Sequence, residues 1–275
     1  MVELWDRATT GIDIPEPPWR LRDVVARGDV RGLSGARIRA QVDTGNEMLT
    51  LWDCARRRGI TWTTDARCLP YWLRAAPLRS ILHWGLASEG RHLLHAAAVG
   101  DERAGALLVG PSGSGKSTTA LACLDDDLGY VADDYVLAET ASSPRAFGLY
   151  GTAKLGASSS SLLPALVAEG HHAGEEKLVV DVAGARPELM RRCASISAIL
   201  LPRVTPGRLT LRPVGAAQAL RALAPSTILQ HADESAGGMA VISALVRRVP
   251  AYVLDLGSDI TAVAPAISAL LERSR

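Results

Sequence analysis

Short alternating runs of polar and apolar residues mark the first part of the chain. Residues 37–42 alternate as a half-buried strand does, and residues 60–64 are rich in strand-forming types. Residues 47–58 fit a strand followed by a turn. These short strands predict a small β-rich N-terminal region over residues 1–76.

A helical spacing follows. Leu78, Ile81 and Leu82 recur on one face, Pro77 suits the first turn of a helix, and Gly90 suits its end. Beyond it, the apolar pattern predicts a mixture of strands and helices. Strands are expected at 92–99, 106–109, 128–134, 147–155, 177–182, 197–201, 209–213 and 252–255, and helices at 117–124, 216–223, 236–249 and 261–273. We therefore expect an α/β protein with a mixed sheet, in which residues 77–275 form the second domain.

The strands at 92–99 and 106–109 are joined only by residues 100–105. A connection of this length suits a hairpin and is too short for a parallel crossover. The sequence thus predicts that these two strands pair antiparallel.

The segment after the second of these strands matches the phosphate-binding pattern G-x-x-x-x-G-K-[ST]. Glycines there let successive backbone N–H groups point into one concave anion site, and the following helix adds its positive end. Lys116 supplies a cation for the β- and γ-phosphates, and the Ser117 hydroxyl suits Mg²⁺. The expected nucleotide-binding residues are Gly110, Ser112, Gly113, Ser114, Gly115, Lys116, Ser117 and Thr118, with ATP and Mg²⁺ as cofactors.

Two carboxylates, Asp133 and Asp134, end the apolar strand that follows. Nucleotide phosphotransferases carry an acidic metal-binding strand at this place. Strand alternation would send the two side chains to opposite sides, so that one faces Mg²⁺ and the other the acceptor. The alternative is that they only cap a turn. His95 lies mid-strand on the hairpin partner, where it either joins the catalytic group or is a packed core histidine.

Other cations are candidates for contacts with the transferring phosphoryl group, which needs positive charge over its equatorial oxygens. They are Lys154, Lys177 and Arg203, and for each an exposed charge is an equally good interpretation. Residues 156–161 and 171–176 are either loops that close over an acceptor or plain surface.

Composition narrows the class of protein. The chain of 275 residues has 30 lysines and arginines against 29 acidic residues, a net charge of +1, which gives no basic field for nucleic acid. No apolar run approaches the roughly 20 residues of a membrane span. The four cysteines show no metal-ligand spacing and fit reduced thiols. We expect a cytoplasmic enzyme, with homo-oligomerisation left open.

Three blocks in order carry a resemblance: residues 94–99 (L-H-A-A-A-V), 106–117 (A-L-L-V-G-P-S-G-S-G-K-S) and 128–134 (L-G-Y-V-A-D-D). They resemble the HPr kinase/phosphorylase family over about residues 92–137. The resemblance implies a P-loop core of the HPr kinase and phosphoenolpyruvate carboxykinase type. It also implies a catalytic pair of His95 and Asp133, with Asp133 as general base, Lys116 on the phosphates, and Ser117 and Asp134 at the Mg²⁺ site.

The chain departs from that family at informative places. Thr118 stands where the family usually has Glu, and neither the glycine-rich R-G-x-G-I-I signature nor the family's N-terminal domain is recognisable. The chain resembles related kinases that act on ribosomally made precursor peptides. The expected function is an ATP-dependent kinase for a Ser or Thr hydroxyl of a peptide or protein. The alternatives are a small-molecule hydroxyl kinase on the same core and a non-catalytic nucleotide-binding regulatory protein.

Overall fold

The computed structural model describes residues 1–25, 28–34, 37–126, 128–156, 171–172, 177–230 and 235–273. The chain divides into two compact units, Met1–Glu89 and Gly90–Arg275. This division comes later than the boundary at residue 76 that the sequence suggests, because the helix α3 (Arg79–Ala87) packs on the strand β4 (Met48–Asp53) of the N-terminal unit.

The N-terminal unit is built on a five-stranded sheet in the order β1-β5-β4-β3-β2. The edge strand β1 pairs parallel with β5, and the remaining neighbours pair antiparallel. Besides β4 and α3, the elements are β1 (Val2–Asp6), β2 (Asp29–Ser34), β3 (Ile38–Asp43), β5 (Arg58–Thr63), α1 (Arg7–Thr10), η1 (Leu21–Asp23), η2 (Ala66–Cys68) and α2 (Tyr71–Ala75).

Two tryptophans form the small core of this unit. Trp52 and Trp84 pack with Ile81, and all three are buried. Glycine is required beside them, because a Cβ at Gly59 would lie 2.8 Å from Trp52 Cε3 and 2.9 Å from Ile81 Cδ1. The helix α3 therefore sits close to the sheet where the sheet carries no side chain.

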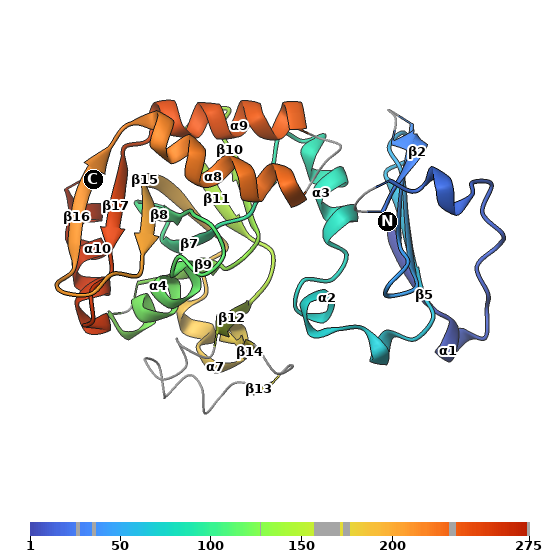
Figure 1. Ribbon diagram of the computed structural model, residues 1–275, viewed down its shortest axis with the longest axis horizontal. Helices are drawn as coiled ribbons and strands as arrows, with labels where there is room; N and C mark the ends of the chain where they lie inside the picture. The colour runs from blue at the N-terminus through green and yellow to red at the C-terminus, as the bar shows by residue number, and fades with distance from the viewer. Residues whose placement is uncertain are drawn as a thin grey trace. The chain divides into compact units, whose positions relative to one another are not determined.

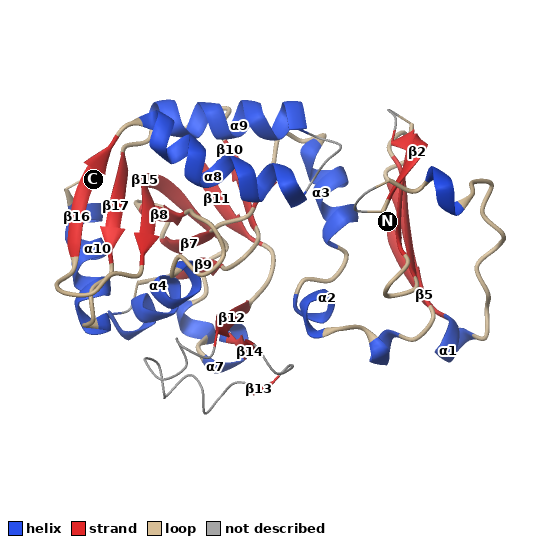
Figure 2. Cartoon of the chain, viewed as in Figure 1, coloured by secondary structure: helices blue, strands red, loops and turns tan. Residues whose placement is uncertain are grey.

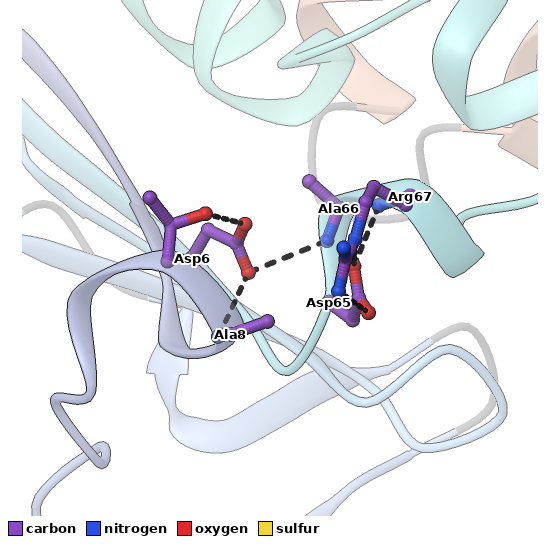
Figure 3. Close-up of polar contacts among 6 residues, drawn as sticks. Asp6, Ala8, Asp65, Ala66 and Arg67 are labelled. Carbon is purple, nitrogen blue, oxygen red and sulfur yellow. Dashed lines mark hydrogen bonds and ion pairs between the residues drawn. The ribbon is translucent and has the colours of Figure 1, made fainter.

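An aspartate joins the end of β1 to the segment that follows β5 (Figure 3). Asp6 Oδ1 accepts hydrogen bonds from the backbone N–H of Ala8 and of Ala66. Asp65 caps the short helix η2, and it also receives hydrogen bonds from the side chain of Arg67. These polar contacts fix the chain ends of the parallel β1–β5 pair.

The C-terminal unit holds a nine-stranded mixed sheet whose main path is β6-β10-β11-β15-β8-β7-β9, with β17 on β15 and β16 on β17. The strands are β6 (His92–Leu94), β7 (Ala97–Gly100), β8 (Gly105–Leu108), β9 (Tyr130–Ala132), β10 (Val136–Glu139), β11 (Arg145–Gly148), β15 (Cys193–Arg203), β16 (Thr210–Val214) and β17 (Ala251–Asp255). A separate three-stranded sheet contains β12 (Thr152–Gly156), β14 (Lys177–Asp181) and β13 (His171–His172).

Helices cover both faces of the large sheet (Figures 1 and 2). Alternate strand residues face opposite layers: Leu108 and Leu200 pack with one cluster, whereas Leu107 and Ile199 pack with the other. The first face is covered by α4 (Lys116–Ala122), η3 (Cys123–Asp126) and α10 (Val263–Glu272), and the second by α8 (Ala216–Gln230) and α9 (Ser235–Arg248). Short helical turns complete the unit: α7 (Val182–Ala185), η4 (Pro187–Leu189) and η6 (Ile260–Ala262).

Strand directions bring the candidate residues to one edge of the sheet. The strands β8 and β7 pair antiparallel, as the sequence predicts, and β7 pairs antiparallel with β9. The C-terminal ends of β8 and β9 and the N-terminal end of β7 therefore share an edge. Because β15 runs parallel to both β8 and β17, the ends of β15 and β17 lie at that edge too.

Two segments that the sequence predicts as single strands are each divided into two strands. Residues 92–99 form two strands, of which β6 pairs with β10 and only β7 pairs with β8, so His95 lies at the break rather than mid-strand. Residues 147–155 are likewise divided between β11 and β12, which belong to different sheets. The predicted loops at 156–161 and 171–176 fall mostly outside the described residues. Within the described part, no helix is long and apolar enough to cross a bilayer.

Candidate active site

The phosphate-binding loop between β8 and α4 depends on its glycines. Gly110, Gly113 and Gly115 have φ angles of 150°, 78° and 102°, which L side chains rarely adopt. A Cβ at Gly110 would lie 2.8 Å from Ser114 Oγ, and one at Gly115 would lie 2.5 Å from Leu256 Cδ1. Backbone conformation thus favours glycine at all three positions, and the lack of space adds to this at Gly110 and Gly115.

Lys116 is held against the start of this loop. Its side chain is buried, and Nζ donates hydrogen bonds to the carbonyl oxygens of Gly110 at 2.9 Å and Pro111 at 3.0 Å. Ser114 Oγ is buried and has no hydrogen-bond partner among the described residues. The loop therefore offers a cation and an uncommitted hydroxyl to an anion.

Asp133 is almost fully buried, with 3% of its surface exposed. Its Oδ2 accepts a hydrogen bond from the backbone N–H of Lys154 at 3.1 Å, and its carboxyl group also bonds to the side chain of Ser117. Burial and the neighbouring negative charge of Asp134 raise the pKa of Asp133 to about 7, although hydrogen bonds to the carboxyl group lower it. Its Oδ1 has no partner in the described part of the chain.

Asp134 is more accessible and lies beside Lys154 and His95. Its Oδ2 lies 2.8 Å from Lys154 Nζ, and its Oδ1 lies 3.7 Å from His95 Nε2. Burial raises the pKa of the Asp134 carboxyl, but the hydrogen bonds and charges of His95 and Lys154 outweigh it and hold the pKa well below its ordinary value. The two adjacent carboxylates thus differ sharply in proton affinity.

A tight turn separates the two carboxylates. Asp134 has a φ of 62°, and the backbone N–H of Tyr135 donates to the carbonyl oxygen of Asp133 at 2.7 Å. A three-residue turn with a positive φ at its centre is rare and strained, and such strain gathers at functional sites. The expectation of simple strand alternation is therefore wrong, because β9 ends at Ala132 and the turn orients the two side chains.

His95 lies between β6 and β7, and contacts of its backbone and of its ring hold it there. Its N–H donates to Thr227 Oγ1 at 3.1 Å, from the helix α8. Its ring centroid lies 6.2 Å from that of Tyr135. The sequence predicts a contact between His95 and Asp133, but the carboxylate that the structure brings to His95 is Asp134. Neither Thr227 nor Tyr135 was a sequence candidate; Tyr135 directly follows the acidic pair, which was a usable signal.

The structure gives a different environment to each additional cation that it describes. Lys154 joins the site through both its backbone N–H and its ammonium group. Arg203 is paired with Asp255 at the end of β15, on the other side of the phosphate-binding loop. The side chain of Lys177 lies outside what the structure describes.

Oxygen donors at the site fit a magnesium–nucleotide complex. Among the described residues no group of three or more His, Cys, Asp or Glu side chains is arranged to hold a metal. Mg²⁺ does not need one, since it binds through one or two protein oxygens, waters and substrate phosphates. The Asp133 carboxyl beside Ser117, with Oδ1 uncommitted, supplies such oxygens.

Comparisons with known proteins give little further guidance. No protein-family model matches the chain, and no curated protein matches it. Among solved structures it is similar to the Hpr(Ser) kinase/phosphatase from Coxiella burnetii, at 12% sequence identity and a TM-score of 0.39, over 66% of this chain and 90% of that chain. Both values are low, so the case for a function rests on the residues of the site.

Proposed function

We propose that the chain is a phosphotransferase that moves the γ-phosphoryl group of ATP, as its Mg²⁺ complex, to the hydroxyl of an acceptor. One observation carries the proposal: the phosphate-binding loop and the Asp133–Asp134 turn lie at the same edge of one sheet, with Lys154 and His95 around the second carboxylate. A site that only held a nucleotide would not need that second group.

The donor is bound by the loop. Backbone N–H groups of the phosphate-binding loop would bind the phosphates, and the buried Lys116 would supply its charge to the β- and γ-phosphates. Ser117 and Asp133 would hold the Mg²⁺ ion through their side-chain oxygens. Mg²⁺ supplies charge neutralisation on the phosphate oxygens when it is bound.

Asp134 faces the acceptor. Its side chain is 23% exposed, whereas Asp133 is buried beside Ser117. As the acceptor oxygen bonds to phosphorus and the bond to the leaving diphosphate breaks, the hydroxyl proton passes to the Asp134 carboxylate. A weakly basic carboxylate suits a loose transition state, in which positioning contributes more than proton removal. Lys154 and His95 keep this carboxylate oriented.

The family resemblance implies the opposite roles, with Asp133 as the general base and Asp134 as the metal ligand. The exchange follows from the contacts, because Ser117 bonds to Asp133 and His95 contacts Asp134. The acceptor class, a Ser or Thr hydroxyl of a peptide or protein, comes from the resemblance alone.

The test is a transfer assay with labelled ATP, Mg²⁺ and candidate peptides, followed by mass spectrometry of the acceptor. Lys116→Ala should lower transfer by about 10²–10³-fold, since it removes a fixed charge from the transferring group. Arg67→Ala, a cation 81% exposed on the N-terminal unit, is the matched control and should leave the rate unchanged. Tight nucleotide binding with no transfer to any peptide or small hydroxyl compound would instead identify a nucleotide-binding regulatory protein.

A further inference from the structure

The loop after β15 forms a second surface beside the phosphate-binding loop. Gly115 lies against this loop and against the loop after β17: a Cβ built there would be 3.6 Å from Val204 Cγ2 and 2.5 Å from Leu256 Cδ1. Val204 is nevertheless 70% exposed, so this aliphatic side chain borders the phosphate site and faces solvent. The loop is thus continuous with the place where the donor's phosphates bind.

Hydrogen bonds make this surface a fixed platform. Leu256 N–H donates to the Arg203 carbonyl oxygen at 2.9 Å, and Ser258 N–H donates to the Gly207 carbonyl oxygen at 3.1 Å. The loop after β15 is therefore tied to the loop after β17. We call residues 203–209 and 255–258 together the β15–β17 platform.

A half-buried carboxylate anchors the platform. Asp255 is 13% exposed and accepts hydrogen bonds from Arg203 at 2.7 and 2.9 Å, from Thr210 at 3.1 Å and from Arg212 at 3.1 Å. The guanidinium groups of Arg203 and Arg212 remain about half exposed. The platform thus presents the aliphatic side chain of Val204 and the planar cation of Arg203, a combination that suits the face of an aromatic ring.

The order of the strands determines which part of the bound donor lies beside the platform. Along the edge the order is β17-β15-β8-β7-β9, so the platform and the Asp133–Asp134 turn flank the phosphate-binding loop on opposite sides. Phosphoryl transfer is roughly in line, which puts the leaving group opposite the acceptor. If the acceptor approaches Asp134, the diphosphate and its nucleoside extend toward β15 and β17.

We propose that the β15–β17 platform binds the nucleoside of the donor, with Val204 in contact with the base. This placement rests on the proposed function, since it takes the Asp134 side as the acceptor side. It adds the residues that distinguish a nucleotide from a bare polyphosphate. The Asp255 network is a positioning device that keeps Val204 beside Gly115.

The experiment compares two ligands, Mg²⁺–ATP and Mg²⁺–tripolyphosphate, by titration calorimetry. Val204→Asn keeps a neutral side chain of similar size, and because Val204 is exposed the variant should fold with an unchanged melting temperature. We expect a roughly 5–20-fold loss of ATP affinity, in keeping with a partly lost aliphatic contact, and no change for tripolyphosphate. Leu4→Asn, an exposed aliphatic residue on β1, is the control and should change neither affinity.

Two results overturn the placement: Val204→Asn leaves ATP affinity unchanged, or it weakens both ligands equally. Lys116→Ala separates this failure from failure of the proposed function, because it should remove binding of both ligands. If Lys116→Ala binds ATP and tripolyphosphate as tightly as the wild type does, the phosphate-binding loop does not hold the phosphates. The proposed nucleoside site is then wrong as well.

Discussion

Lys154 Nζ lies 2.8 Å from Asp134 Oδ2, although Lys154 belongs to the three-stranded sheet and Asp134 to the turn that follows β9 of the large sheet. Tyr130 Oη donates to the Thr152 carbonyl oxygen at 3.0 Å, and this bond fixes β12 beside β9. The three-stranded sheet therefore contributes a charged group to a site that is otherwise built at the edge of the large sheet.

Replacing Lys154 should impair transfer more than binding. Lys154→Met removes the ammonium group that faces Asp134 and keeps the backbone N–H that bonds to Asp133. We expect a loss of about 10²-fold or more in transfer rate, typical of a fixed charge removed from an active site, with nucleotide affinity nearly intact. Lys154→Arg keeps the charge and should retain more activity. An equal loss of affinity and rate in Lys154→Met would mean that Lys154 contacts the donor instead.

Replacement of Asp133 and replacement of Asp134 should affect different properties of the protein. Asp133→Asn should abolish the enhancement of nucleotide affinity by Mg²⁺, because its oxygens are the ones beside Ser117. Asp134→Asn should retain that enhancement and lose transfer by roughly 10²–10⁴-fold, or less if the transition state is loose. Asparagine tolerates the positive φ of 62° at this position, so the comparison tests charge rather than backbone.

The measurement is calorimetry with and without Mg²⁺, together with transfer rates for both variants. The reverse result, in which Asp134→Asn loses the metal effect and Asp133→Asn loses only rate, would restore the roles implied by the family resemblance.

Stability of the nucleotide-free protein should depend on Asp133. Its pKa is about 7 in the folded chain against an ordinary value of 3.8, so the folded state favours the protonated form. The stability that this preference gives is complete below about pH 4 and is lost as the pH rises toward 7. Asp134 acts in the opposite sense, because its lowered pKa contributes stability that is lost only as the pH falls below its ordinary range.

Asp133→Asn should remove the first of these dependences. The melting temperature of the variant minus that of the wild type should therefore increase between pH 5 and pH 8, in chelator and without nucleotide. The corresponding change in the free energy of unfolding is on the order of a few kcal/mol at most, since one pKa unit corresponds to about 1.4 kcal/mol. A difference that stays flat with pH would show that Asp133 is ionised throughout.

Close packing at Gly59 gives a prediction for the N-terminal unit. Gly59→Ala should destabilise it by about 1–3 kcal/mol, because the new methyl group overlaps Trp52 and Ile81. Gly45→Ala is the matched control: its Cβ would meet only Asp43 Oδ1, at 3.6 Å, an ordinary contact. Tryptophan fluorescence during urea unfolding reports the effect. Equal midpoints for the two variants would contradict the packing.

Local patterns in the sequence predict the local parts of the site. The phosphate-binding loop, the antiparallel hairpin before it and the mixed α/β character follow from motif, spacing and periodicity. The identity of the partners does not, because it depends on tertiary contacts. The bend at His95 is set by Thr227, far along the chain, and the orientation of Asp134 by a turn with an unusual φ. Lys154 was one of three equal candidates until the small sheet placed it.

The pairing of β8 with β15 has a consequence for how the chain acquires its structure during synthesis. The strand that leads into the phosphate-binding loop spans Gly105–Leu108, and its parallel neighbour spans Cys193–Arg203. Until the ribosome has released that later segment, one edge of an apolar strand has no neighbour to pair with, which is a recognised route to aggregation. Parallel pairing across so long a stretch also folds slowly. The nascent protein is thus most vulnerable just before the second half of its central sheet emerges.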